Sequence, residues 1–566
     1  MTQDFFDTNM WMLLVGTTIL IVILWGLRVV KTGAITITWN GTVKRLGLLA
    51  ASALVSLLVS PNKTESVLAP FGLGTFLSLF LIALVGATFL DEQGKNILKW
   101  CLFTTVSLAG LLAIYQFFGF TKLIEINVSL MTVFIVTLPI MINEAFHKKQ
   151  VAIVMSVACL GGLVATAYQV LPNWGGATLP YWANWQIMLE SYKNIKQLFV
   201  GVGAENFLGA FTVGRPVTIN MTDLWNTRFI VGSSMLFHIA TVYGIIGAAA
   251  FIWFLTGLHP AILFPSALSL IFLPPSFGAL VVIVALLMLT EPVPVPKRFN
   301  LLWLRYPTIA FILILIAVSG YGLVRAYGAE LAFSRSLRAF DAREGTNAYN
   351  LQIQAITLNP NVTRFHTAYA QTNLALADAI AKNASASAED RKTTTQLIQQ
   401  AIREAKIAVG LSPTNILAWE NIASVYQALT GVAQGADQWT VAAYQQAMQL
   451  DPTNPSVRLR LGGAFVGQQK LDQAEISYLA AIQLKSDYAN AYYNLAFVYR
   501  QQKKYLAAAQ SLKEALAYVT PGSDDERQAK KELDEVSNLL TEAEKQSLNA
   551  PAATPTPKSA PLSPLP

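Results

Sequence analysis

Long apolar runs constrain the fold of this chain more than any other feature of its sequence. Almost all of them lie before residue 330, whereas the chain beyond that point is polar and rich in Ala and Gln. A helix needs about 20 apolar residues to cross about 30 Å of hydrocarbon, and about ten runs meet or approach that length. Charged residues make up only 13% of the chain, against roughly 25% in ordinary soluble proteins. The sequence therefore predicts an all-α protein, with a polytopic transmembrane helical bundle followed by a helical domain in water.

The apolar runs predict about ten spans, two of them short. Pro274 and Pro275 interrupt the run at 261–290, and proline inside a helix removes a backbone hydrogen bond and breaks the helix. We therefore expect two short spans there, with one interrupted span as the alternative. The predicted spans are 11–29, 46–60, 71–90, 99–118, 126–142, 151–171, 232–256, two within 261–290, and 307–326.

The basic loops between these runs predict the orientation of the bundle. Loops rich in Lys and Arg face the cytoplasm, whereas the loops at 61–70 and 119–125 carry one Lys each. We expect a multi-pass protein of the cytoplasmic membrane, with the loop 172–231 and everything after residue 327 on the extracytoplasmic side. The basic residues that set this orientation are Arg28, Lys31, Lys44, Arg45, Lys95, Lys99, Lys148, Lys149, Lys297, Arg298 and Arg305.

A pattern with a period of 34 residues marks the polar half of the chain. The period and pattern resemble the tetratricopeptide repeat (TPR), a pair of antiparallel helices with small residues where the helices cross. Proline cannot continue a helix, and Pro360, Pro413 and Pro452 follow the expected second helices. We expect an α-helical TPR solenoid of four to five repeats over about 337–518, then a polar capping helix to about 547. The recurring positions are Leu461, Gly462, Phe465, Ala474, Tyr478 and Ala481, with counterparts Leu495, Ala496, Tyr499, Ala508, Leu512 and Ala515.

Three domains and a restricted set of partners follow from these patterns. We expect a transmembrane domain at 1–330 with the external loop 172–231, a TPR domain at 337–548, and a Pro-rich disordered tail at 549–566. The resemblance to TPR proteins implies a concave surface that binds a protein or peptide, and it implies no catalysis. No Lys/Arg cluster is interleaved with aromatics, so we expect membrane lipids but no nucleic acid as partners. Metal-type cysteine spacing and phosphate-binding glycine loops are missing from the sequence, so we expect no metal and no cofactor beyond lipid.

The loop 172–231 and the span after it hold the residues that could carry chemistry. Residues 182–192 have the apolar spacing of a helix, and the glycine turn Leu198–Phe207 (LFVGVGAENF) follows them. A helix, a glycine turn, a large external loop and a span with a polar opening resemble the O-antigen ligase and polymerase superfamily over about 182–247. The resemblance implies transfer of a polyprenyl-diphosphate-linked glycan to an acceptor outside the cytoplasmic membrane. Related membrane proteins carry external TPR repeats.

The span after the loop departs from this family at one position. Gly244 and Gly247 match the end of the family's motif, and Ser233 occupies the place where the ligases carry a histidine. His238 lies five residues later, about 140° past a full helical turn, so we expect it on a different helix face from Ser233. Two roles stay open for His238, an ordinary buried histidine and a functional one, since ionisable residues in spans are often functional.

Transfer from a diphosphate needs a cation for the leaving group and a base for the acceptor hydroxyl. Arg228 lies where the chain re-enters the predicted membrane, with a salt bridge to Asp223 or a headgroup contact as its alternative role. Glu205 is a candidate base in the glycine turn, or a cap for a helix that starts near Asn206. Ser233 would need an activating neighbour to serve as a base. The predicted catalytic residues are Arg228, Arg215, Ser233, His238 and Glu205.

Three further loop residues are candidates for substrate binding. The faces of Trp185 and Trp225 can stack on sugar rings, or the two side chains can lie at a membrane interface. Lys193 can contact the substrate or a lipid headgroup, or it can be solvated.

Two hypotheses about function follow. The first is a membrane glycan ligase or polymerase whose TPR domain docks an acceptor or an envelope partner, with Arg228 and the resemblance in its favour. The second is a non-catalytic, membrane-anchored TPR scaffold for cell-envelope assembly, which Ser233 favours. A transporter would carry ionisable residues deep in several spans, and the sequence has almost none apart from His238.

Overall fold

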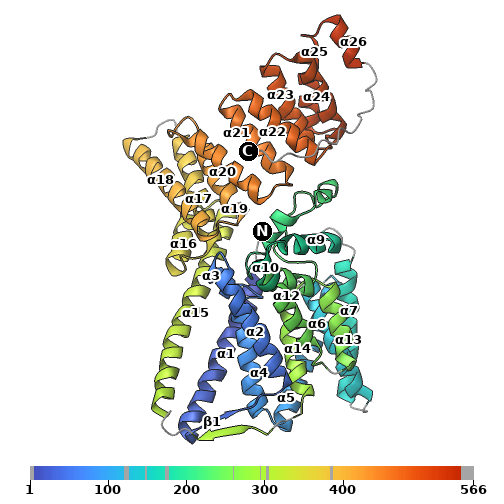
Figure 1. Cartoon of the computed structure of the whole chain (residues 1–566), viewed down its shortest axis with the longest axis vertical. Helices are drawn as coiled ribbons and strands as arrows, with labels where there is room; N and C mark the ends of the chain where they lie inside the picture. The colour runs from blue at the N-terminus through green and yellow to red at the C-terminus, as the bar shows by residue number, and fades with distance from the viewer. Residues whose placement is uncertain are drawn as a thin grey trace. The chain divides into compact units, whose positions relative to one another are not determined.

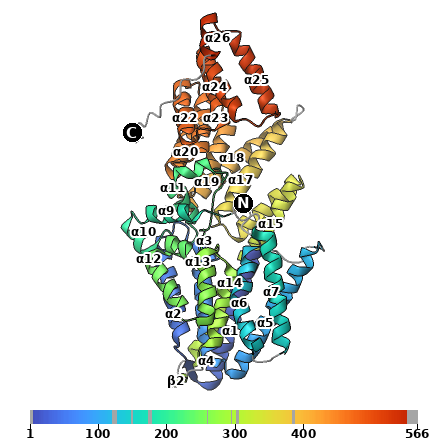
Figure 2. The same cartoon turned by 90° about the vertical axis from the view of Figure 1, so that its right-hand side faces the viewer.

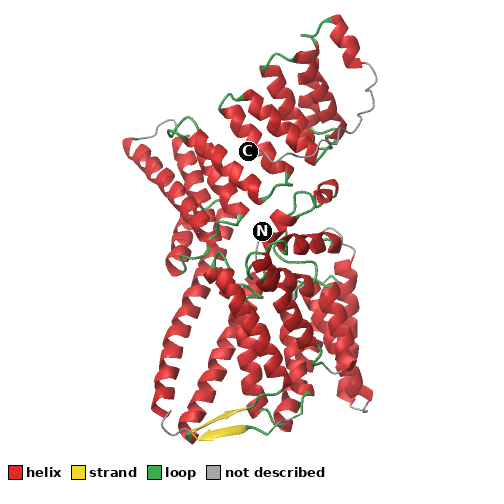
Figure 3. Ribbon diagram, in the orientation of Figure 1, coloured by secondary structure: helices red, strands yellow, loops and turns green. Residues whose placement is uncertain are grey.

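The computed structural model shows an almost entirely helical chain (Figures 1 and 3). It describes residues 5–119, 121, 127–146, 150–171, 178–258, 260–292, 295–300, 305–382 and 387–549. The chain forms two compact units. The first runs to Ala428 and includes Gln449–Thr453, and the second comprises Leu429–Met448 and the chain from Asn454. The predicted all-α fold is confirmed.

An apolar helix bundle makes up most of the first unit. Eight helices of the described chain are long and apolar enough to cross a membrane, and two further apolar helices are shorter. These features are compatible with a membrane protein. The helices before the loop are α1 (Phe5–Thr32), α2 (Gly41–Val59), α3 (Lys63–Leu68), α4 (Leu73–Phe89), α5 (Glu92–Phe117), α6 (Val128–Phe146) and α7 (Gln150–Val170).

The run at 261–290 forms two helices, as its prolines predicted. α13 (Pro260–Phe272) and α14 (Phe277–Thr290) are separated by a short break that contains Pro274 and Pro275. The Ser276 side chain accepts a hydrogen bond from the Ala279 N–H and so satisfies one free donor at the start of α14. Pro265 lies inside α13 without ending the helix, so a single proline is not sufficient to cause the break between α13 and α14.

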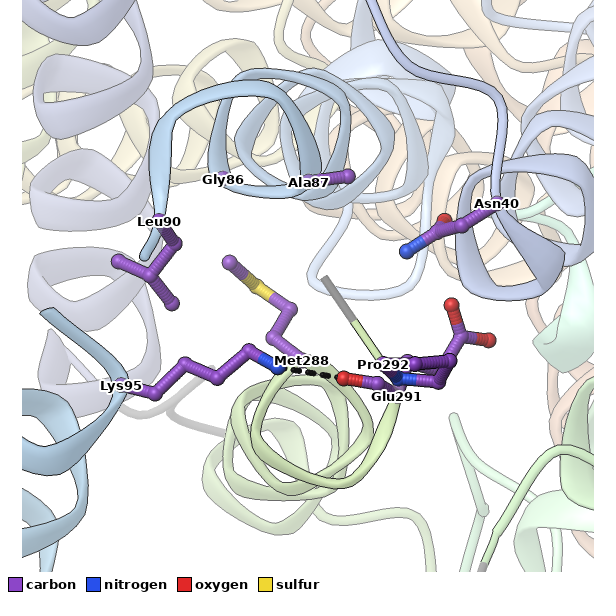
Figure 4. Close-up of a pocket in the computed structure, with 8 residues that line it drawn as sticks. All are labelled: Asn40, Gly86, Ala87, Leu90, Lys95, Met288, Glu291 and Pro292. Carbon is purple, nitrogen blue, oxygen red and sulfur yellow. Dashed lines mark hydrogen bonds between the residues drawn. The ribbon is translucent and has the colours of Figure 1, made fainter. Parts of the chain in front are cut away.

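The predicted basic loops gather at one end of the bundle, which we call the strand end. There β1 (Ala34–Ile37) pairs antiparallel with β2 (Lys297–Asn300), as Figure 1 shows. Lys95 Nζ donates to the Glu291 carbonyl at 2.5 Å, and Arg45 forms a salt bridge with the Glu291 carboxylate at 3.3 Å. Lys95 and Glu291 border a pocket of about 10 Å³ (Figure 4), which is room for about one water molecule. Lys148 and Lys149 lie outside the described residues.

The loop end of the bundle lies opposite. Its helices are α9 (Tyr181–Ser191), α10 (Ile195–Val200) and α11 (Phe207–Gly214), followed by α12 (Met235–Leu255). The predicted helix at 182–192 is confirmed by α9. Both views place α9 and α10 at the same end as α3 (Figures 1 and 2).

One uninterrupted helix, α15 (Arg305–Asp341), joins the bundle to the repeats. It contains both the predicted last span and the start of the predicted repeats, and its later part packs against α16 (Gly345–Leu358). The first unit then contains α17 (Thr363–Ala381), α18 (Ala388–Leu411) and α19 (Ile416–Ala428). α20 (Ala436–Leu450) follows, and its last residues belong to the first unit.

The second unit continues the series of paired helices. α21 (Pro455–Gly467) packs on α22 (Leu471–Leu484), and α23 (Ala489–Gln501) packs on α24 (Tyr505–Tyr518). Two polar helices, α25 (Asp524–Ser537) and α26 (Glu542–Asn549), end the described chain. A polar end suits a solenoid cap, but the prediction of a single capping helix to about 547 is wrong. The predicted tail beyond Asn549 lies outside the described residues.

Equivalent turns within the helix pairs support a true repeat. Arg343, Gln469 and Lys503 have left-handed φ angles of 61°, 58° and 59°, and each lies between the two helices of a pair. Such angles are uncommon outside glycine, so their recurrence marks one turn geometry. The occurrence at Arg343 shows that the end of α15 and α16 form a helix pair of the same kind.

Close helix crossings in the repeats depend on small residues at the predicted positions. Ala474, Ala481 and Ala508 are fully buried. A Cβ placed on Gly462 would lie 2.4 Å from the Tyr478 ring, whereas one on the adjacent Gly463 would meet no atom closer than 3.9 Å. Gly462 is therefore required by the contact between α21 and α22.

We predict that Gly462→Ala destabilises the repeats and that Gly463→Ala does not. The added methyl at position 462 overpacks the crossing, which costs about 1–3 kcal/mol. At position 463 the better helix propensity of alanine contributes up to about 1 kcal/mol of stability. Urea midpoints for proteolytic cleavage within the repeats measure both effects, and equal midpoints for the two variants would contradict the assigned contact.

Candidate functional site

The glycine turn at 198–207 lies directly against a kink in α12. Gly244 has non-helical angles, with a φ of +65°, and a Cβ there would lie 2.6 Å from the Phe199 backbone. Gly201, with a φ of +74°, would place a Cβ 2.2 Å from the Val242 backbone. The Val202 and Gly203 N–H groups donate to the Thr241 and Val242 carbonyls at 3.2 Å each. The structure thus brings together two segments that sequence analysis had identified separately.

Glu205 in this turn belongs to a hydrogen-bond network at the loop end. Its Oε1 accepts from the Ser60 hydroxyl and from the Asn62 N–H at 3.2 Å. The expected capping role of Glu205 is wrong, because α11 begins with Asn206 in the N-cap position and Glu205 turns toward the end of α2. The predicted start of a helix near Asn206 is confirmed.

The same network reaches the first repeats. The Glu65 carboxylate accepts from the Thr363 N–H at 2.6 Å, and the Asn62 side chain donates to the Asn361 carbonyl at 3.0 Å. The Thr414 hydroxyl donates to the Asn206 side chain at 2.9 Å. Bundle, loop and repeats therefore share one polar network within the first unit.

A cavity of about 450 Å³ lies beside this network. Its polar wall contains Glu65, Glu205, Glu330, Arg364 and His238. Its apolar wall contains Trp11 and Met12 of α1, Leu68, Phe71 and Leu208. Of the predicted catalytic residues, only Glu205 and His238 line it.

His238 is buried at the edge of the cavity between two aromatic rings. Its ring centroid lies 5.6 Å from that of Phe71 and 5.2 Å from that of Phe207. The Gly232 N–H donates to His238 Nδ1 at 3.3 Å. The expected separation from Ser233 assumed one continuous helix, but α12 begins only at Met235, so the angular reasoning does not apply.

Ser233 is fixed by Asn184 of α9. The Ser233 N–H and hydroxyl both donate to Asn184 Oδ1, at 2.6 Å and 3.2 Å. An amide oxygen accepts a hydrogen bond but cannot take the proton, so this contact does not activate the serine. In this structure Ser233 positions the start of α12 against α9.

Arg228 is engaged by carboxylates of the repeats. It forms a bidentate pair with Glu420 at 2.6 Å and 2.8 Å and lies 3.7 Å from Asp451, and among the described residues it forms no salt bridge with Asp223, its alternative partner. Burial lowers the pKa of Arg228, but the hydrogen bonds and charges of Glu420 and Asp451 outweigh it and hold the pKa above its ordinary value. The guanidinium is largely buried, with a side-chain exposure of 12%.

Arg215 is buried more completely, with 2% exposure. Its Nη2 donates to Asn220 Oδ1 at 2.6 Å and to the Trp225 carbonyl at 2.8 Å. Burial lowers the pKa of Arg215, and the positive charge of the nearby Arg228 lowers it further. The negative charge of Asp451 raises the pKa but does not outweigh the burial. The Arg215 side chain thus bonds residues of its own loop, and only its backbone carbonyl accepts from the Thr453 hydroxyl, at 3.1 Å. Arg228 is the arginine whose side chain holds the loop against the repeat residues of the first unit.

The predicted substrate-binding residues lie away from the cavity. Trp185 on α9 is half-exposed, and its ring lies 6.0 Å from that of Phe237. Lys193 is exposed and pairs with Glu190 at 2.7 Å. Trp225 contributes its carbonyl to Arg215. None of these three residues is among the described residues that line the cavity.

Sequence analysis missed the residues that join the bundle to the repeats. Asn62 and Glu65 match an N-cap and the third helical position, and the Asn62 side chain accepts from the Glu65 N–H at 3.1 Å. That signal could have located the start of α3. The contacts to Thr363 and Glu420 have no local signal, because the partners lie far away in the sequence.

The comparisons with known proteins identify the repeats. A TPR repeat family model matches residues 462–503, which extend from α21 through α23. The chain thus contains a TPR repeat, and TPR domains in general bind protein or peptide partners. No curated protein matches the chain.

Similar solved structures are TPR proteins and the MamA protein. A thermophilic TPR protein of Thermus thermophilus is 18% identical, with 38% of this chain and 100% of that chain covered and a TM-score of 0.28. MamA from Desulfovibrio magneticus is 14% identical, with 34% and 94% covered and a TM-score of 0.28. YrrB, a TPR protein with an unusual peptide-binding site, is 15% identical, with 35% and 90% covered and a TM-score of 0.27.

We predict that Arg228→Ala loosens the repeats of the first unit, because it leaves two buried carboxylates without their cation. Removing one partner of a buried ion pair costs about 3–5 kcal/mol. The double variant Arg228→Ala, Glu420→Ala should lose less than the sum of the single variants. Lys193→Ala is the matched control, since an exposed pair contributes at most about 1 kcal/mol.

Hydrogen exchange of α19 in the full chain measures this coupling. Additive effects of the two substitutions, or equal effects of Arg228→Ala and Lys193→Ala, would show that the pair does not hold the repeats.

Proposed function

We propose that this chain is a polytopic protein of the cytoplasmic membrane that presents a TPR docking domain on the extracytoplasmic side. The continuous helix α15 is the observation that carries the proposal. It leads from an apolar segment into the pair that it forms with α16 without a flexible linker, and the helix pairs of the first unit are anchored to the bundle in this way. The basic residues gathered at the strand end support the orientation, because basic loops face the cytoplasm.

The partner in this proposal is a protein or peptide bound by the repeats. The TPR repeat match at 462–503 supports such docking, and Phe497 on α23 is an exposed side chain within that match. Single exposed apolar side chains are ordinary on a protein surface, so Phe497 is the position at which docking is tested and not itself the evidence for it. The function is then that of a membrane-anchored scaffold for cell-envelope assembly.

A photocrosslinker at Phe497 tests docking and orientation together. p-Benzoylphenylalanine in place of Phe497 in living cells should crosslink to an extracytoplasmic protein, and the same group at Glu542 on the capping helix should not. A cytoplasmic crosslinked protein would reverse the orientation. Equal crosslinking at both positions, or none at Phe497, would remove the support for docking there.

Glycan transfer is a second candidate function, favoured by the contact of the glycine turn with the kink at Gly244. These are the two segments that resemble the O-antigen ligase and polymerase superfamily. In this candidate Glu205 is the base beside the cavity, His238 lies near it, and a polyprenyl-diphosphate-linked glycan is the donor. Arg228 and Arg215 would have to leave their present partners to bind the diphosphate.

A transfer assay distinguishes the two candidates. Purified protein would be given a polyprenyl-diphosphate-linked oligosaccharide and candidate acceptors. If the second candidate holds, Glu205→Gln lowers transfer at least about 100-fold, the usual contribution of general acid–base catalysis. Glu92→Gln, an exposed carboxylate of α5, should leave transfer unchanged. If the unaltered protein shows no turnover across a range of donors, glycan transfer is excluded and the scaffold function is the remaining candidate.

A further inference from the structure

The cavity at the loop end has walls from three parts of the first unit. Trp11 and Phe71 come from the bundle, Glu205 from the glycine turn, and Thr363 and Arg364 from the repeats. Its volume of about 450 Å³ lies in the range of ligand sites. The repeats therefore complete a site that the bundle alone does not enclose.

Carboxylates dominate the charge of this cavity. Three line it, and the one cationic side chain among the described lining residues, Arg364, forms a salt bridge with Glu330. Glu65 and Glu205 form no salt bridge within the described part of the chain. Glu205 Oε2 is buried and has no hydrogen-bond partner among the described residues. Burial of such a charge is unfavourable unless a cation or a proton neutralises it.

His238 adds one donor to the same cavity. Its Nδ1 accepts from the Gly232 N–H, so the neutral ring carries its proton on Nε2. The side chain is 2% exposed, and the described chain offers no protein partner to Nε2. A cationic head group cannot accept this hydrogen bond, so His238 takes no part in binding one.

Apolar side chains form the remaining wall. Trp11 and Met12 of α1, together with Leu68 and Leu208, offer a surface for a hydrocarbon chain. A ligand that satisfies both walls therefore has an apolar tail and a head group that donates hydrogen bonds or carries positive charge.

We propose that this cavity binds an amphiphile with an ammonium head group, held by Glu65 and Glu205, with its tail against Trp11 and Leu68. An ammonium supplies the charge and the donors that the two carboxylates need. A phosphate or diphosphate head group would meet two carboxylates without a free cation, because Arg364 is paired and neither Arg215 nor Arg228 lines the cavity. The site does not depend on partner docking by the second unit, so either proposal can fail without the other.

Photolabelling of the full chain in phosphatidylcholine nanodiscs tests this site. A dodecylammonium probe with a diazirine in its tail should label the peptide around Leu68–Phe71, and mass spectrometry identifies the labelled residues. Excess dodecylammonium should compete, and dodecyl phosphate should compete at least about tenfold less well. Glu205→Gln should weaken labelling about tenfold, as expected for the loss of one charge-assisted hydrogen bond.

Two further variants keep the test decisive. Glu92→Gln removes an exposed carboxylate outside the cavity and should label like the unaltered protein. Ile230→Trp enlarges a half-exposed residue of the cavity wall without changing any charge, and it should abolish labelling even if Glu205→Gln does not fold. Retained labelling in Ile230→Trp, or dodecyl phosphate that competes as well as dodecylammonium, would overturn the proposal.

Discussion

The backbone contact between the glycine turn and the kink in α12 is the constraint on which the candidate site depends. An α-helix bonds each carbonyl to the N–H four residues later, and non-helical Gly244 interrupts that ladder just after Thr241 and Val242. Their carbonyls accept from Val202 and Gly203. Only residues without a Cβ allow the two backbones to approach this closely, since a Cβ on Gly201 would lie 2.2 Å from Val242. The approach places Glu205 beside Ser60 and Asn62 at the wall of the cavity.

The attachment of the repeats follows from this placement. Asn62 and Glu65 are fixed by the start of α3, and they bind the segment that leads into α17. The Arg228–Glu420 pair adds a second attachment. A buried ion pair adds little net stability compared with apolar residues of the same volume, because desolvation offsets the attraction. It does exclude arrangements that leave either charge unpaired, so this pair determines where α19 lies on the loop more than how stable the unit is.

Periodic features of the fold were predictable from the sequence, and long-range polar pairs were not. Hydropathy located the apolar helices, Pro274 and Pro275 located the break between α13 and α14, and the 34-residue period located the repeats. Gly244 was found through a motif, but its contact with Gly201 needed the structure. Closeness in sequence made Asp223 the alternative partner predicted for Arg228. The carboxylate that Arg228 binds in the structure is that of Glu420, which lies 192 residues away in the sequence. Such a pair leaves no periodic signal in either segment.

The contacts of Arg228 and Arg215 distinguish two roles that the sequence could not tell apart, namely binding a lipid diphosphate and binding groups of the protein itself. A loop arginine at the predicted membrane boundary suits a lipid diphosphate, and it equally suits a carboxylate on a domain that follows the loop in the chain. The guanidinium fork of Arg228 is already filled by Glu420, and Arg215 is enclosed with Asn220 and Trp225. Glu65 and Glu205, which have no salt bridge among the described residues, line the cavity instead. A diphosphate ligand would therefore require the repeats to release Arg228, which would break one of the attachments that hold them to the loop.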